Sequence, residues 1–210
     1  MSAVFTVLAV AAAVAFIFVH EKGMEPLKLP YKTAASISFT LLGAVCLVQT
    51  GVSIYGILVL AALMLGCIGD IFLQIPKGGD GCFIAGLIAF LLGHLVYIAA
   101  FAVKTGLLWI QPVAAVVLFA AVMVLLRLLR ADFGAQKALV YAYAAVIAVM
   151  MGCALTVGPM ASIAAALFVV SDLVLALIRF AGKTRKGMTL INLVTYYTAQ
   201  IMLALSVAMI

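Results

Sequence analysis

The chain has 210 residues, of which 69% are hydrophobic and only 9% are charged, and its net charge is +6. Soluble domains carry about 25% charged residues, so this composition excludes a soluble globular protein. The positive charges lie in short loops between apolar runs. We therefore interpret them as signals of membrane topology and as contacts for anionic membrane lipids, and expect no nucleic-acid partner.

Apolar runs of about 20 residues recur along the chain, and each is long enough to cross a bilayer as a helix. The sequence predicts an all-α polytopic membrane protein, in which eight transmembrane helices form one bundle and residues 1–210 form a single domain. The first run lacks the basic segment of a signal peptide, so we predict a helix there. The predicted spans are residues 2–20, 33–50, 53–75, 82–103, 108–128, 137–156, 161–180 and 188–209.

Lysine and arginine are distributed unevenly over the predicted loops. Eleven of the 12 basic residues follow the first, third, fifth and seventh spans, and the other side holds only Lys104. The basic side is expected to face the cytoplasm, with both termini opposite. Short loops suit a bacterial inner membrane. The eleven residues are Lys22, Lys28, Lys32, Lys77, Arg127, Arg130, Lys137, Arg179, Lys183, Arg185 and Lys186.

Two carboxylates interrupt the apolar runs. Asp70 follows Gly69 in the third span, and Asp172 follows Ser171 in the seventh. A charge at mid-membrane costs at least ~2.5–3.5 kcal/mol, so such residues are functional hypotheses by default. At about 1.5 Å per helical residue, Asp70 lies about 8 Å and Asp172 about 12 Å from the cytoplasmic ends of their spans.

Further polar residues lie at similar depth on the fourth and eighth spans. Lipid offers no hydrogen bonds, so these groups need one another, and we expect one polar cavity that opens toward the cytoplasm. In the last span Asn192, Tyr196 and Gln200 recur every four residues and share one helix face. The set expected to orient substrate or water is His94, Tyr97, Ser171, Asn192, Tyr196, Tyr197 and Gln200.

Each of these residues also has a structural interpretation. Asp70 could be solvated near the loop. Arg179, the nearest cation to Asp172 in the sequence, lies seven residues and about 10 Å away, too far for a direct bond. Asp172 could instead pair with an arginine or lysine of another helix. His94 could simply bond a backbone carbonyl, and the tyrosines could be large side chains whose hydroxyls found partners. A metal site would have to use His94 and both aspartates, because His20 looks interfacial. No ligand spacing supports it, so we predict no metal and no cofactor.

Other catalytic signatures are absent from the sequence. It contains no Gly-x-Ser-x-Gly elbow and no glycine-rich phosphate loop, and its cysteines lack a nearby activating charge. Acid–base chemistry by carboxylates is therefore favoured over covalent nucleophilic catalysis.

Four motifs in order resemble the YhhN family of eight-span membrane proteins, whose animal members are lysoplasmalogenases. A Lys-Pro element that the family tends to have where the second span begins is half matched by Lys32-Thr33. The motifs are Gly69-Asp70-x-x-Leu73, Phe83-x-x-Gly86-x-x-x-Phe90-x-x-x-His94-x-x-Tyr97-x-x-x-Phe101, Phe168-x-x-Ser171-Asp172-x-x-Leu175-Ala176, and Tyr196-Tyr197-x-Ala199-Gln200.

The resemblance implies a lysolipid substrate and hydrolysis of the vinyl ether bond of a lysoplasmalogen to a fatty aldehyde and a glycerophospho-alcohol. Protonation of the β-carbon gives an oxocarbenium ion, to which water adds. Asp172 is expected to donate the proton and Asp70 to be the ionised partner, although the reverse assignment remains open. Lys32 would attract the phosphate.

Two questions of function stay open at the level of the sequence. A proton-coupled transporter or lipid-binding protein without hydrolase activity is the alternative, because paired intramembrane aspartates also serve proton relays. The sequence also does not choose between vinyl ether and ester substrates, and it leaves the oligomeric state unknown.

Overall fold

The computed structural model describes residues 1–128, 132–180 and 187–209, and so leaves Arg130, Lys183, Arg185 and Lys186 outside the described residues. The described part contains no strand and eight helices that are long and apolar enough to cross a membrane, which confirms the predicted all-α membrane protein. The helices are α1 (Ser2–Glu21), α2 (Glu25–Thr50), α3 (Ile54–Gln74), α4 (Gly79–Thr105), α5 (Ile110–Leu128), α6 (Lys137–Val157), α7 (Pro159–Phe180) and α8 (Met188–Met209).

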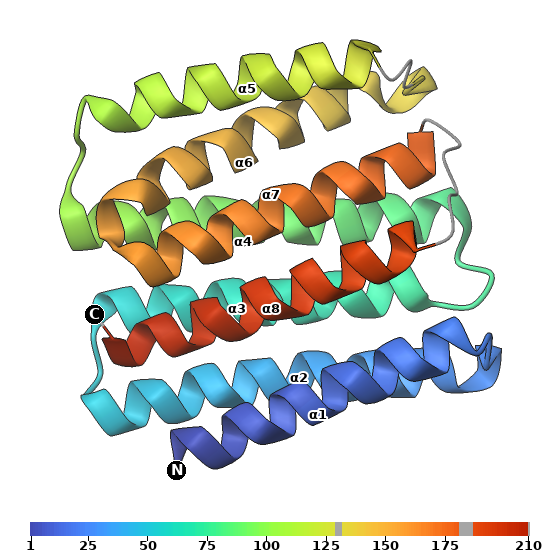
Figure 1. The fold of residues 1–210 in the computed structure, drawn as a ribbon, viewed down its shortest axis with the longest axis horizontal. Helices are drawn as coiled ribbons and strands as arrows, with labels where there is room; N and C mark the ends of the chain where they lie inside the picture. The colour runs from blue at the N-terminus through green and yellow to red at the C-terminus, as the bar shows by residue number, and fades with distance from the viewer. Residues whose placement is uncertain (129–131, 181–186, 210) are drawn as a thin grey trace.

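The helices lie roughly parallel in two layers (Figure 1). One layer contains α1, α8 and α7, the other contains α2, α3 and α4, and α6 and then α5 continue the bundle beyond α4 and α7. Both termini lie at one end of the bundle. We call the other end the basic end, because the described cations there are Lys22, Lys28, Lys77, Arg127, Lys137 and Arg179.

The second helix begins earlier than predicted, at Glu25 instead of residue 33. Pro26 does not prevent this, because its missing N–H falls in the first turn, where that group has no intrahelical partner. The helix also continues through Pro30. The prediction that Lys32 lies in a loop is therefore wrong, since Lys32 is a buried residue inside α2.

The other helix ends lie within three residues of the predicted ones. The seventh helix begins at Pro159, where the sequence suggested a break, because proline is favoured at the first helical position. The tight connection after Thr50 makes α2 and α3 packed antiparallel neighbours, as expected.

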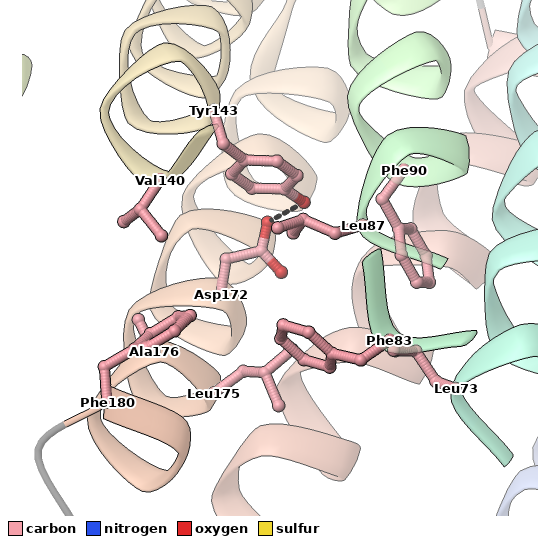
Figure 2. A pocket seen from close by; sticks show the side chains of 10 residues that line it. All are labelled: Leu73, Phe83, Leu87, Phe90, Val140, Tyr143, Asp172, Leu175, Ala176 and Phe180. Carbon is pink, nitrogen blue, oxygen red and sulfur yellow. Dashed lines mark hydrogen bonds between the residues drawn. The ribbon is translucent and has the colours of Figure 1, made fainter. Parts of the chain in front are cut away.

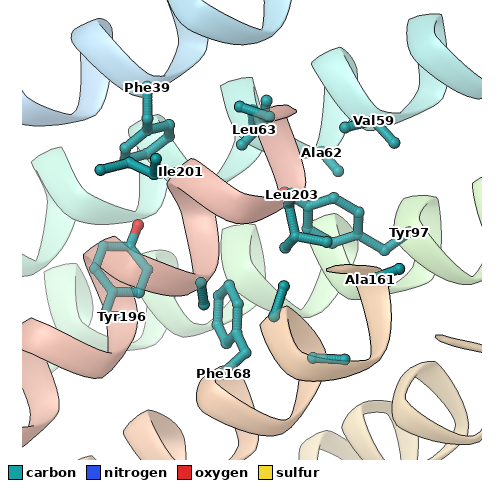
Figure 3. Packing of buried hydrophobic residues seen from close by; sticks show 14 of the residues in the cluster. Phe39, Val59, Ala62, Leu63, Tyr97, Ala161, Phe168, Tyr196, Ile201 and Leu203 are labelled. Carbon is teal, nitrogen blue, oxygen red and sulfur yellow. The ribbon is translucent and has the colours of Figure 1, made fainter. Parts of the chain in front are cut away.

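The apolar core lies between the two layers, farther from the basic end than the two aspartates. Phe39, Leu63, Phe168 and Leu203 are completely or almost completely buried there (Figure 3). The half of the bundle nearer the termini is thus filled by side chains, and the buried carboxylates lie in the other half.

Small residues let α3 and α4 approach closely beside Asp70. A Cβ atom at Gly69 would lie 2.7 Å from the Phe90 ring. A Cβ atom at Gly86 would lie 2.9 Å from the Leu73 side chain and 3.1 Å from the Gly69 carbonyl oxygen. Such close contact between helices is typical of small residues in membrane proteins, and here it sets the position of the third helix near its polar end.

We expect Gly86→Ala to lower the thermal stability of the detergent-solubilised protein, because the new methyl group meets both a side chain and a backbone oxygen. Overpacking of this kind costs about 1–3 kcal/mol. Gly81→Ala on the same helix is the control, since nothing lies within 4 Å of a Cβ atom there. A Gly86→Ala variant that unfolds at the same temperature as Gly81→Ala would show that the contact is looser than described.

Candidate active site

A polar cavity of about 400 Å³ lies near the basic end, between α1, α2, α3, α4, α7 and α8. Several lining residues are at helix ends, including Gln74 at the end of α3 and Thr189 at the start of α8, so the cavity reaches toward the basic end. Both aspartates line it. Its polar lining residues are His20, Lys32, Asp70, Gln74, Ser171, Asp172, Arg179, Thr189, Asn192 and Tyr196.

Asp70 is almost completely buried, at 1% exposure, and three side chains from two other helices bind its carboxylate. Ser36 Oγ lies 2.5 Å and Tyr196 Oη 2.6 Å from Oδ2, and both donate to it. Lys32 Nζ lies 3.2 Å from Oδ1. A lysine and two hydroxyl donors thus surround this buried carboxyl group and supply it with an ion pair and two hydrogen bonds. The interpretation of Asp70 as a group solvated near the loop is wrong.

A chain of hydrogen bonds leads from Asp70 into the bundle. Tyr97 Oη donates to Gln200 Oε1 at 3.0 Å, and Gln200 Nε2 donates to Tyr196 Oη at 3.1 Å. Tyr196 in turn donates to Asp70. Each group in this series of hydrogen bonds donates to the next group in the direction of the Asp70 carboxylate. Tyr97 and Gln200 are therefore placed to orient Tyr196, and they do not line the cavity themselves.

Asp172 has a different environment. Its Oδ2 accepts a hydrogen bond of 2.7 Å from Tyr143 on α6 (Figure 2). His94 Nε2 on α4 lies 3.8 Å from the same oxygen. No lysine or arginine of the described residues forms a salt bridge with Asp172. Arg179 instead pairs with Asp80 at the surface. The alternative of a structural Asp172–Arg pair therefore fails for the described residues.

His94 lies behind Asp172 and outside the cavity lining. Its Nδ1 is 2.7 Å from the Phe90 carbonyl oxygen, and a carbonyl can only accept, so Nδ1 must carry a proton. Its Nε2 is buried without a hydrogen-bond partner and faces Asp172. The Phe168 ring packs edge-on at 4.7 Å between ring centroids and fixes the imidazole. Nε2 therefore faces the Asp172 carboxyl group at 3.8 Å, which is beyond hydrogen-bond distance.

Ser171 and Asn192 join α7 to α8 beside the cavity. Asn192 Nδ2 donates to the Ser171 carbonyl oxygen at 2.8 Å and lies 2.9 Å from its Oγ. These bonds fix the turn of α7 that carries Asp172. Both side chains reach the cavity wall, where they can contact water or a ligand.

The structure thus divides the predicted site residues into two groups. Lys32, Asp70, Ser171, Asp172, Asn192 and Tyr196 line the cavity, and His94, Tyr97, Tyr197 and Gln200 lie outside its lining. Tyr197 packs its ring against Tyr196, with 5.0 Å between the centroids. Sequence reasoning missed Ser36 and Tyr143. Ser36 lies one helical turn after Lys32, so a longer second helix would have put both on one face.

The positions of His94, Asp70 and Asp172 do not support the metal-site alternative. Within the described ranges, no three or more histidine, cysteine, aspartate and glutamate side chains come together closely enough to hold a metal ion. His94 and the two aspartates therefore do not form a ligand set there.

A comparison with protein families identifies a relationship over most of the chain. The model of the YhhN family matches residues 31–207. Searches of curated proteins and of solved structures found no match. The matched segment contains both aspartates and every side chain that bonds them.

We expect Lys32→Met to destabilise the protein by about 3–5 kcal/mol, because it leaves the charge of Asp70 buried without its cation. Lys32→Met with Asp70→Asn removes both charges and should recover most of the loss. Thermal unfolding in detergent measures both.

Lys28→Met is the matched control. Lys28 belongs to the same helix and pairs with the exposed Glu25 at 2.6 Å, a contact expected to contribute no more than about 1 kcal/mol. Equal losses in Lys32→Met and Lys28→Met would contradict the buried ion pair.

Proposed function

The chain belongs to the YhhN family, and from this premise we propose that it is a lysoplasmalogenase-like hydrolase that cleaves the vinyl ether bond of a single-chain lipid. The family includes lysoplasmalogenases. The observation that supports the proposal most is that one cavity is lined by two carboxylates with opposite environments. Asp70 has a lysine partner, whereas Asp172 has a tyrosine and a histidine.

The two aspartates have different roles in the proposed reaction, since one donates a proton and the other stabilises the cation that forms. Asp172, without a cation, is the proton donor, and its proton goes to the β-carbon of the vinyl ether. The α-carbon and the ether oxygen then share a positive charge. Asp70 stays ionised and lowers the energy of this cation, as fixed charges do when they face a developing charge in a site of low dielectric.

Water completes the reaction. It adds to the α-carbon and gives its proton back to Asp172, and the resulting hemiacetal separates into the aldehyde and the alcohol. Ser171 and Asn192 lie next to Asp172 in the cavity wall and are placed to hold this water. Tyr196, bonded to Asp70, is the second candidate for this role. Atoms balance as vinyl ether plus water to aldehyde plus alcohol.

The headgroup phosphate is expected to be bound by the cations of the cavity. Lys32 faces Asp70 with one N–H and has two further donors. Arg179 lies in the lining, and its exposed pair with Asp80 contributes little, so a phosphate can replace that carboxylate. We infer that the basic end faces the cytoplasm, as the distribution of lysine and arginine favours.

The central test is an assay of purified protein with a lysoplasmalogen and a matched acyl lysolipid, in which aldehyde and fatty acid are measured separately. We expect aldehyde from the first substrate only. Fatty acid from the second would instead indicate an esterase of the same architecture. Binding of either lipid without any product would favour the lipid-binding or transport alternative.

Asp70→Asn and Asp172→Asn should each lower aldehyde release strongly. Loss of the general acid alone is expected to cost about 10²–10⁴-fold. Size-exclusion profiles and unfolding temperatures like those of the wild type show that each variant is folded. Full activity in either variant would remove that residue from the mechanism.

Tyr143→Phe should lower kcat about tenfold with little change in KM, because it removes a hydrogen bond worth about 1–1.5 kcal/mol that holds the Asp172 carboxyl. Tyr141→Phe is the matched control, since Tyr141 packs against Phe133 and away from the cavity. A rise in KM alone for Tyr143→Phe would show that Tyr143 binds substrate and does not position the acid.

A further inference from the structure

An apolar cleft adjoins the polar cavity on the side of α6 (Figure 2). It lies between the basic-end halves of α4, α6 and α7, and its far wall is formed by Leu87, Val140, Ala176 and Phe180. Asp172 lies in the middle of this group of side chains.

The cleft and the polar cavity meet at Asp172. Five residues line both spaces, namely Leu73, Phe83, Phe90, Asp172 and Leu175. A molecule can therefore extend from one space into the other past the carboxyl group of Asp172.

The two spaces differ sharply in polarity. Among the described residues, the cleft has two polar lining side chains, Asp172 and Tyr143, and they bond each other. The polar cavity, in contrast, carries Lys32, Arg179 and Asn192. A polar ligand would lose its hydrogen bonds in the cleft, whereas a hydrocarbon loses nothing there.

We infer that the apolar cleft binds the hydrocarbon chain of a single-chain lipid, whose headgroup lies in the polar cavity. The junction between the chain and the headgroup then lies beside Asp172, which is where the bond to be broken must be. This inference rests on the proposed function and adds the direction in which the substrate lies. The cleft encloses about 50 Å³, so it leaves no room for a second chain beside the first.

The cleft must widen to admit a chain, because it encloses only about 50 Å³. Phe83 of α4 and Phe180 of α7 close it edge-to-face, with 6.1 Å between their ring centroids. Beside them Arg179 lies over the Phe83 ring and pairs with Asp80. The Arg179–Asp80 contact connects α4 to α7 at the exposed basic end. Phe180 also packs against Phe133, with 5.4 Å between the ring centroids, so opening the cleft requires these aromatic rings to move together.

Photolabelling tests the inference with the full chain in lipid nanodiscs. The probe is a lysolipid with an alkyl ether in place of the vinyl ether and a diazirine in the chain near the headgroup. We expect labels on the segments of α4, α6 and α7 that line the cleft, competed by excess unlabelled alkyl lysolipid. A two-chain phospholipid with the same diazirine should not label those segments.

Ala176→Phe fills the cleft and should weaken binding of the alkyl lysolipid about tenfold or more, because the new ring occupies the space of the chain. The matched control is Val170→Phe on the same helix, whose side chain is exposed on the outer surface of the bundle. Labels confined to outer surfaces, equal labelling by the two-chain lipid, or equal binding by both variants would overturn the inference.

The two proposals fail separately in these experiments. The alkyl lysolipid cannot be hydrolysed by protonation of a double bond, so its binding does not depend on catalysis. Labels in the cleft without aldehyde release from a lysoplasmalogen would leave the chain site standing and overturn the proposed function. Aldehyde release with labels outside the cleft would support the proposed function and overturn the chain site.

Discussion

The buried ion pair between Lys32 of α2 and Asp70 of α3 is the contact on which the polar half of the bundle depends. A charge in hydrocarbon surroundings is tolerated only with a partner, and breaking such a pair is far more costly than replacing it. The pair requires the second helix to extend back beyond residue 33, so that Lys32 can face the third helix. Tyr196 adds the eighth helix to the same carboxylate, and so three helices converge on one charge.

Asp172 is held by a separate set of three helices. It belongs to α7, Tyr143 to α6 and His94 to α4, whereas the partners of Asp70 come from α2 and α8. The cavity therefore lies at the boundary between two groups of helices, and each group sets the environment of one carboxyl group. Because the two environments differ, two aspartate side chains in one cavity can have different roles in the proposed reaction, as in pairs of catalytic carboxylates.

The sequence alone predicted the eight helices and six of the ten polar residues that line the cavity. Apolar length and polar interruptions are direct consequences of the membrane environment. The sequence predicts a loop at Lys32 because Gly23 and Pro26 suggest a break, although the helix begins at Glu25 and includes Pro26 in its first turn. The sequence does not show which of Tyr141 and Tyr143 reaches the site, because both lie in the same apolar run. His94 lies at the predicted depth but outside the cavity, because the face that a helix turns inward depends on packing that spacing does not reveal.

The distribution of buried groups favours a one-sided pocket over a transport path. A carrier would need polar groups that continue toward the end with the termini. Among the described residues, the hydrogen-bond chain from Asp70 leads inward only as far as Tyr97. Beyond it the space between the layers is filled by fully buried side chains such as Val59, Leu63 and Leu203. Nearer the termini, Tyr55 Oη and Ser206 Oγ form a separate buried hydrogen bond of 2.8 Å. Among the described residues no hydrogen bond joins this pair to Tyr97, so the hydrogen-bonded path from the basic end stops at Tyr97, which supports the proposed one-sided pocket.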